Sequence, residues 1–211
     1  MWSYIAALAL MLMGLPDWAA HAEDVVGNTD HSNDTSAPSL VANVCESCHG
    51  KNGNSTDASV PSLAGQNRVY LQHQLAAFQT QRRVGIMSGV AMGLNHADIE
   101  EAALYFSQQS AKVAAIGTSS SGALQRGEDI YVEGLTATEV PPCASCHALN
   151  GGGLPPEFPR LAGQHARYIA EQLRAFRSSD RYGNNAMMRK VSARLSDDDI
   201  RAVSAYIEQL H

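Results

Sequence analysis

The chain lacks the features that mark several large protein classes. Its 211 residues contain 15 Lys and Arg against 21 Asp and Glu, a formal net charge of −6, so the positive surplus of a nucleic-acid-binding protein is missing. Beyond the N-terminal segment, no apolar stretch is long enough to span a membrane. No run of alternating apolar and polar residues predicts a β-strand. What is left is a helical, mildly acidic protein with no nucleic-acid partner.

Cysteine is also scarce, and all four cysteines occur in two copies of one motif, Cys-x-x-Cys-His. The copies comprise Cys45, Cys48 and His49, then Cys143, Cys146 and His147. This spacing is typical of c-type haem attachment, because two thiols one turn apart can each add to a vinyl group of one porphyrin. The histidine that follows can then bind the iron from the proximal face. The motifs therefore predict two covalently bound haem c groups.

Disulfide bonds and a zinc site are the alternative uses of these cysteines. A disulfide framework is common in exported proteins, but it gives no reason for a histidine to follow both pairs. Zinc accepts Cys and His ligands, but the two pairs stand much farther apart than the about 15–20 residues of a zinc ribbon. Both alternatives are weaker than haem attachment.

A fixed offset aligns the first half of the chain with the second. At an offset of 98 the two motifs coincide, and residues 63–66 match residues 161–164. The same offset pairs Tyr70, Gln74, Leu75 and Phe78 with Tyr168, Gln172, Leu173 and Phe176. Three extra residues in the second half then raise the offset to 101. Ordered identities of this kind indicate a duplication, and each half is small enough to need a buried haem for its core.

Composition divides the chain into five segments. Residues 5–15 are apolar and precede an A-x-A pattern that ends at Ala22, which predicts a signal peptide over residues 1–22 and export to the periplasm. An uncleaved N-terminal anchor is the alternative. Polar residues 23–38 predict a disordered lead-in. Residues 39–110 form the predicted N-terminal domain, the Gly- and Ser-rich residues 111–121 a linker, and residues 122–211 the C-terminal domain.

Helical periodicity predicts the secondary structure of both halves. Two equivalent apolar faces are formed by Tyr70, Leu71, Leu75 and Phe78, and by Tyr168, Ile169, Leu173 and Phe176. Later in each half, a polar residue precedes an aspartate by three positions, which is the signature of a helix N-cap. These pairs are Asn95 with Asp98, and Ser196 with Asp199. The sequence predicts an all-α fold.

The repeat also predicts the iron ligand opposite each motif histidine. Methionine, histidine or an open position are the possibilities. At the offset of 101, Met87 aligns with Met188, whereas Met92 and Met187 have no methionine counterpart. We predict Met87 and Met188 as the distal ligands. The alternative is that these methionines fill gaps in the core.

Each motif histidine also needs an acceptor for its second ring N–H, which fixes the orientation of the ring. Pro61 and Pro159 each lie 12 residues after their histidine, and a proline carbonyl is free to accept. We predict that these carbonyls hold His49 and His147. The alternative is that each proline only starts the turn that follows it.

Within the two predicted domains, four histidines outside the motifs have no counterpart in the other half. They are His73, His96, His165 and His211. Because the repeat does not preserve them, we predict that they are surface residues and not iron ligands.

Taken together, these features resemble the dihaem cytochrome c4 family over nearly all of the mature sequence. The paired motifs, the Leu-Ala-Gly-Gln segments after Pro61 and Pro159, and residues 87–94 and 188–195 carry the resemblance. It implies a tandem duplication of a class I cytochrome c domain, each copy wrapped around one covalent haem, with the copies related by a pseudo-twofold axis. One departure concerns the first helix, since Gly127 and Tyr131 of the second half have no equivalents among residues 39–44.

The resemblance also implies a function. It implies a periplasmic electron carrier that is not an enzyme, with a membrane bc1-type complex or a small periplasmic protein as donor and a terminal oxidase as acceptor. Peripheral membrane association is compatible with it. Two alternatives are the dihaem subunit of a flavocytochrome c sulfide dehydrogenase and a dihaem enzyme of the peroxidase or thiosulfate dehydrogenase type. An enzyme needs an open or unusual axial site, against which the methionine shared by both halves argues.

Overall fold

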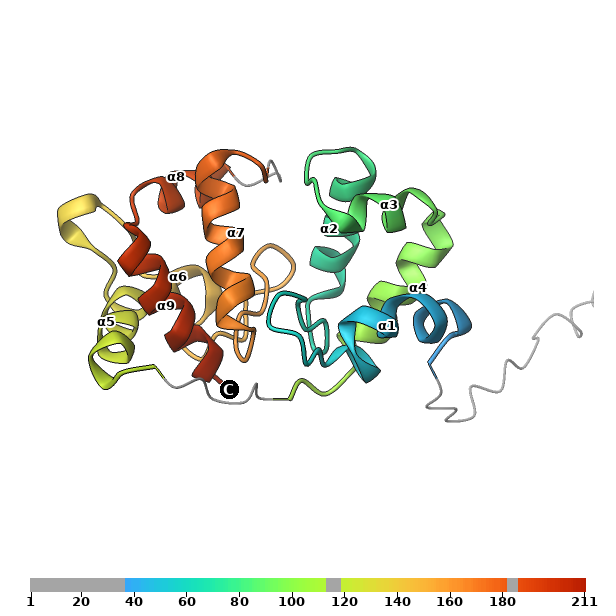
Figure 1. The fold of residues 1–211 in the computed structure, drawn as a ribbon, viewed down its shortest axis with the longest axis horizontal. Helices are drawn as coiled ribbons and strands as arrows, with labels where there is room; N and C mark the ends of the chain where they lie inside the picture. Colours follow the sequence, from blue (N-terminus) through green and yellow to red (C-terminus); the bar gives the residue numbers. More distant parts are fainter. Residues whose placement is uncertain (1–36, 113–118, 182–185) are drawn as a thin grey trace, which may run out of the picture. The chain divides into compact units, whose positions relative to one another are not determined.

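The computed structural model describes residues 37–112, 119–181 and 186–211, which are built from helices (Figure 1). Within these ranges the extended backbone is limited to isolated bridges, such as the one between Leu135 and Val140. The all-α prediction is therefore confirmed. The predicted signal peptide, and the predicted lead-in up to residue 36, lie outside the described residues. No helix in the described part of the chain has the length and apolar character to cross a membrane.

The first half builds its helices around a small apolar core. Its elements are η1 (Val41–Cys45), α1 (Glu46–His49), η2 (Lys51–Gly53), α2 (Arg68–Gln79), α3 (Ile86–Met92) and α4 (His96–Ser107). Helix α2 packs against α3 and α4 (Figure 1). The core cluster consists of Val41, Leu71, Ala102, Ala103 and Phe106.

The second half repeats this plan with one additional long helix. Its elements are α5 (Ser121–Val132), η3 (Thr136–Thr138), α6 (Ala144–His147), α7 (Ala166–Ser178), α8 (Ala186–Ala193) and α9 (Asp197–Gln209). Helix α9 packs against both α5 and α7 (Figure 1). The cluster at this contact includes Ile130, Tyr131, Ile200 and Val203, all buried.

Two domain boundaries differ slightly from the predicted ones. Ala37 already packs against the core of the first half, and the Pro38 carbonyl accepts a hydrogen bond from the Ala42 N–H at 2.9 Å. The described part of the first half therefore begins at residue 37, two residues before the predicted start of the N-terminal domain. Helix α5 starts at Ser121, with Ser120 as its N-cap, which is one residue before the predicted start of the second domain.

The expected difference between the first helices of the two halves is present. In the second half, α5 crosses α9 so closely that a Cβ atom on Gly127 would lie 2.2 Å from the Ala202 carbonyl oxygen. In the described part of the first half, the corresponding segment is the short helical run of residues 39–45, whose Val41 is buried. Among the described residues, a helix crossing so close that it requires glycine occurs in the second half only.

Replacement of Gly127 by alanine tests this crossing. We expect Gly127→Ala to lower the free energy of unfolding by about 1–3 kcal/mol, because the added methyl group must displace backbone. Gly122→Ala on the same helix is the matched control, since a Cβ there meets nothing within 4 Å and alanine favours a helix by about 0.5–1 kcal/mol. Chemical unfolding followed by circular dichroism measures both. Equal effects at the two positions would contradict a tight contact between α5 and α9.

The two predicted N-caps are confirmed as capping boxes. Asn95 and Asp98 exchange side chain to backbone hydrogen bonds at the start of α4, and Ser196 and Asp199 do the same at α9. Asp199 is buried and also accepts from Arg126 Nη2 at 2.8 Å. Burial raises the pKa of Asp199, but hydrogen bonds from Ser196 and Arg126 lower it by more, so that its net pKa lies below the usual value.

This depressed pKa gives the Asp199 cap a defined pH dependence. A carboxylate with a lowered folded-state pKa stabilises the fold above its unfolded pKa of about 3.9, and loses that contribution as the pH falls through the folded value. We expect Asp199→Asn to cost about 1 kcal/mol near neutral pH, with the difference from wild type vanishing in acid. Asp98→Asn, at the exposed cap of α4, is the matched control and should cost less. A cost for Asp199→Asn that stays constant down to acid pH would contradict the role of its charge.

Candidate functional site

A cavity of about 800 Å³ is shared by both halves. Its lining contains every residue predicted to bind haem: Cys45, Cys48, His49, Met87, Cys143, Cys146, His147 and Met188. The rest of the lining is largely apolar and includes buried core residues such as Leu71 and Phe106. The fold therefore gathers the two sets of predicted ligands, which are far apart in the sequence, around one space.

The cysteines open onto this cavity as free thiols. All four lie in described segments and none forms a disulfide. Helices α1 and α6 each carry the second cysteine and the histidine of a motif. Burial raises the pKa of Cys143 to about 11. No cluster of three or more acidic, His or Cys side chains that could hold a metal ion occurs in the described ranges, so those ranges contain no zinc-type site.

Both motif histidines are buried and oriented by a proline carbonyl. His49 Nδ1 lies 2.8 Å from the Pro61 oxygen, and His147 Nδ1 lies 3.0 Å from the Pro159 oxygen. A carbonyl can only accept, so Nδ1 carries the proton and Nε2 keeps its lone pair. Burial lowers the pKa of both imidazoles and outweighs the proline hydrogen bond, which raises it. Each ring is thus a neutral imidazole with Nε2 available to a metal.

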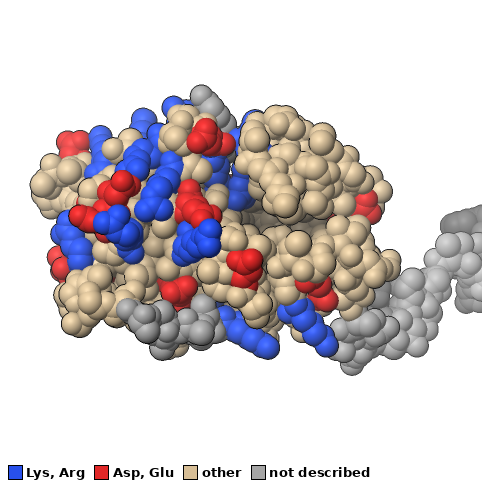
Figure 2. All heavy atoms as spheres, in the orientation of Figure 1, with Lys and Arg blue, Asp and Glu red and all other residues tan. Residues whose placement is uncertain are grey.

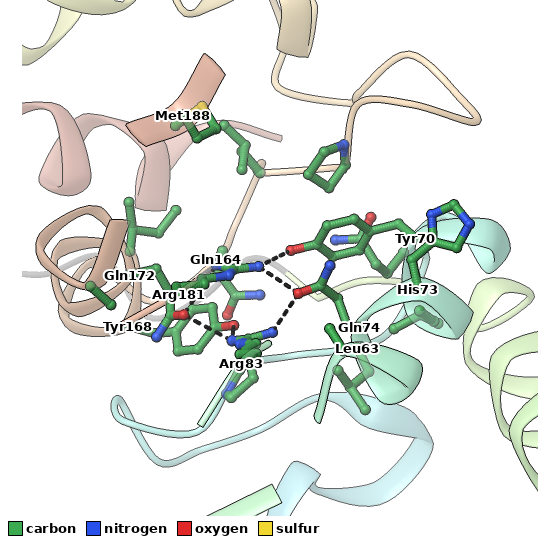
Figure 3. A pocket seen from close by; sticks show the side chains of 18 of the residues that line it. Leu63, Tyr70, His73, Gln74, Arg83, Gln164, Tyr168, Gln172, Arg181 and Met188 are labelled. Atoms are coloured by element: carbon green, nitrogen blue, oxygen red, sulfur yellow. Dashed lines mark hydrogen bonds between the residues drawn. The ribbon is translucent and has the colours of Figure 1, made fainter. Parts of the chain in front are cut away.

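The two methionines that align between the halves are less exposed than the two that do not. Met87 in α3 and Met188 in α8 are half-buried and line the cavity, with Met188 beside the pocket in Figure 3. Met92 is 63% exposed and Met187 is 51% exposed. A thioether, a neutral imidazole and two thiols in each half form a donor set that suits a c-type haem.

The prediction that all unmatched histidines lie on the surface is right for three of them and wrong for His165. His73, His96 and His211 are exposed. His165 is only 9% exposed, and its Nε2 lies 3.1 Å from the Ser55 carbonyl oxygen of the first half. Its Nδ1 lies 4.0 Å from Glu208. A residue without a counterpart can still be buried, because it can contact the other half.

Two glutamines of the repeated Leu-Ala-Gly-Gln segment join the halves reciprocally. Gln164 accepts from the Ser62 N–H and donates to the Ser62 carbonyl, both at 2.9 Å. Gln66 makes the same pair of bonds to the backbone of Arg160, both at 2.9 Å. Each side-chain amide thereby acts as a strand-like partner for one residue of the opposite half. Sequence reasoning identified these glutamines as repeated but did not assign them a contact.

A second reciprocal network, formed by side chains, lines the cavity (Figure 3). Arg83 donates to Tyr168 and Gln172 of the second half, and Arg181 donates to Tyr70 and Gln74 of the first. The arginines also match at the offset of 98, but no prediction from the sequence included them. A charged residue repeated next to predicted core positions is the signal that could have revealed them.

Comparison with known proteins gives consistent matches. The family model for cytochrome c matches residues 124–211. Cytochrome c4 of Azotobacter vinelandii is 36% identical over 200 residues, covering 89% of this chain and 94% of the relative. The crystal structure of reduced recombinant cytochrome c4 from Pseudomonas stutzeri superposes with a TM-score of 0.74 at 38% identity, covering 81% of this chain and 95% of that one. A thiosulfate dehydrogenase electron acceptor of Thiomonas intermedia is 32% identical over 205 residues, covering 95% of this chain and 88% of the relative.

The glutamine contacts generate a prediction about stability. Gln164→Leu leaves the Ser62 N–H and carbonyl without their partner, so we expect it to lower the free energy of unfolding by about 1–3 kcal/mol. Gln66→Leu should cost a similar amount. Gln125→Leu is the matched control, because Gln125 is exposed and bonds only to Asp129 on its own helix. Thermal unfolding compares the three variants. A Gln164 variant as stable as the Gln125 control would show that these bonds do not hold the halves together.

Proposed function

Because the chain belongs to the cytochrome c4 family, whose members are electron-transfer proteins with c-type haem, we propose that it is an electron carrier with one covalent haem c in each half. One observation carries this proposal. Each half presents to the shared cavity two free thiols, a buried neutral imidazole held by a proline carbonyl, and a half-buried methionine.

The proposed ligands are assigned by half. Cys45 and Cys48 would hold the first haem covalently, and His49 and Met87 would ligate its iron. Cys143 and Cys146 would hold the second haem, and His147 and Met188 would ligate its iron. The carbonyls of Pro61 and Pro159 orient the two imidazoles, which supports this assignment because a fixed ring is a better ligand. The halves on either side of residues 111–121 are then two cytochrome c domains.

When bound, haem iron supplies one-electron chemistry between its ferrous and ferric states. The protein contributes three things to this chemistry. The imidazoles are kept neutral and in one tautomer, so that no proton must leave before the ring can act as a ligand. The methionine thioethers favour the ferrous state and so raise the reduction potential. With a histidine and a methionine on each iron, neither haem would offer a substrate a free position, so no catalytic residue is proposed.

The proposal extends to partners and location. We place the protein in the periplasm, exported by a signal peptide over residues 1–22 that is cleaved after Ala22. Its donor is a membrane bc1-type complex or a small periplasmic redox protein, and its acceptor is a terminal oxidase of the respiratory chain. The A-x-A pattern and the family membership support these assignments.

Electron acceptance from a thiosulfate dehydrogenase is a second candidate function. The relative from Thiomonas intermedia bears the name of such an acceptor and matches along 95% of this chain. A thiosulfate dehydrogenase structure from Marichromatium purpuratum also superposes, with a TM-score of 0.72 at 31% identity over 78% of this chain. This chain covers only 36% of that structure, which favours the role of electron acceptor over that of the enzyme itself.

The axial assignment predicts distinct spectra for four methionine variants. Oxidised wild-type protein should show the weak far-red absorption band of iron–methionine ligation at two-haem strength, and carbon monoxide should change the reduced spectrum little. Met87→Ala and Met188→Ala should each halve the band and open one haem to carbon monoxide. Met92→Ala and Met187→Ala are the controls and should match wild type.

Other outcomes would redirect the assignment. If Met187→Ala halves the band and Met188→Ala does not, the second ligand is the neighbouring methionine. If wild-type protein lacks the band or binds carbon monoxide readily, an axial position is open. The carrier function then gives way to a dihaem enzyme.

A further inference from the structure

Two arginines are buried at the cavity between the halves. Arg83 is 8% exposed and Arg181 is 6% exposed, and both line the cavity together with the haem-binding motifs. Each guanidinium stacks on an aromatic ring of its own half. Arg83 Cζ lies 4.5 Å from the centroid of Phe78, and Arg181 Cζ lies 4.4 Å from that of Phe176. Burial and ring stacking therefore fix the position of both guanidinium groups.

The two guanidinium groups share the same acceptors. Gln74 Oε1 accepts from Arg83 Nη1 at 2.8 Å and from Arg181 Nη2 at 2.7 Å. Gln172 Oε1 accepts from Arg83 Nη2 at 2.8 Å and from Arg181 Nη1 at 3.0 Å. The cations are therefore close neighbours, and their mutual repulsion adds to the cost of burying them.

None of the acceptors in this network is a carboxylate. Besides the two glutamines, Tyr168 accepts from Arg83 and Tyr70 accepts from Arg181, each at 2.7 Å. No carboxylate among the described residues lies within ion-pairing distance of either arginine. Three N–H bonds of each guanidinium are accounted for by these contacts, out of the five that arginine offers.

Other arginines of the second half are paired with acids. Arg126, Arg167, Arg174, Arg177, Arg194 and Arg201 each have a carboxylate within 4.0 Å. Figure 2 shows basic and acidic side chains interspersed over this half. Within the described residues, carboxylates thus pair with arginines at the surface, where pairing matters little, and none pairs with Arg83 or Arg181, where it would matter most.

We propose that Arg83 and Arg181 form a joint clamp for the propionate carboxylates of the two haems. The inference rests on the proposed function, because the propionates are present only when both haems are attached. Arginine suits the role, since its planar fork can hold a carboxylate through two parallel N–H bonds. Each arginine is bonded to the opposite half, so each acts on the carboxylates of both haems.

The clamp has two electrostatic consequences. A buried positive charge next to a haem favours addition of an electron, so each arginine raises the reduction potential. A positive charge also stabilises the ionised carboxylate, which keeps the propionates charged and the potential independent of pH near neutrality. Loss of one arginine should lower both potentials and make them fall as the pH rises, because the carboxylates then take up protons in the working range.

Potentiometric titration of haem-loaded Arg83→Gln, followed by absorption, tests the clamp. We expect the equilibrium constant for reduction of both haems to fall about tenfold, which corresponds to about 59 mV for a one-electron couple. Arg181→Gln should give the same result. Arg201→Gln removes one charge at an exposed position and is the control, with potentials expected to match wild type. Arg83→Lys keeps the charge and should restore most of the potential.

The test separates failure of the clamp from failure of the carrier function. Mass spectrometry first establishes two haems per chain, which bears on the proposed function alone. Unchanged potentials in two-haem Arg83→Gln would overturn the clamp and leave the carrier function standing. If that variant does not load haem, wild-type protein is titrated between about pH 6 and about pH 8. Potentials that vary across this range would overturn the clamp, and constant potentials would support it.

Discussion

The contact between the two halves is the interaction on which the rest of the structure depends. Each half is small for a core of its own, and several of its polar groups at the contact have partners in the other half. The Gln66 and Gln164 amides bond to opposite backbones, and Arg83 and Arg181 bond to opposite side chains. These bonds close the space into which both Cys-x-x-Cys-His motifs open.

Within each half, the motif depends on a turn that follows the histidine directly. Gly50 and Ala148 occupy equivalent positions there, with φ of 75° and 65°. Glycine adopts this conformation easily, but alanine does not, so the second half stores strain beside its motif histidine. The Ala148 carbonyl accepts a hydrogen bond from the buried Tyr131 hydroxyl at 2.7 Å. The first half, whose described residues lack an equivalent of α5, uses glycine and needs no such support.

The features that the sequence predicts well are those fixed by local chemistry or by the repeat. The helix faces and the capping boxes at Asn95 and Ser196 follow from spacing within one half. The features it misses depend on contact between the halves. His165 was assigned to the surface because it has no repeat partner, yet its partner is the Ser55 carbonyl of the other half.

Because of the repeat, the contact between the halves brings two arginines together, and two buried cations without an acid point to a negatively charged ligand. In a reciprocal contact between equivalent halves, a residue near the symmetry axis faces its own copy. Neutral amide groups tolerate this arrangement, because each can bond to the backbone of the opposite half, as Gln66 and Gln164 do. A cation there meets a second cation in a buried place, and the cost is largest where no acid is near. A source of negative charge beside Arg83 and Arg181 would offset this cost, and the proposed clamp assigns that role to the carboxylates of the haems, at the cavity onto which both motifs open.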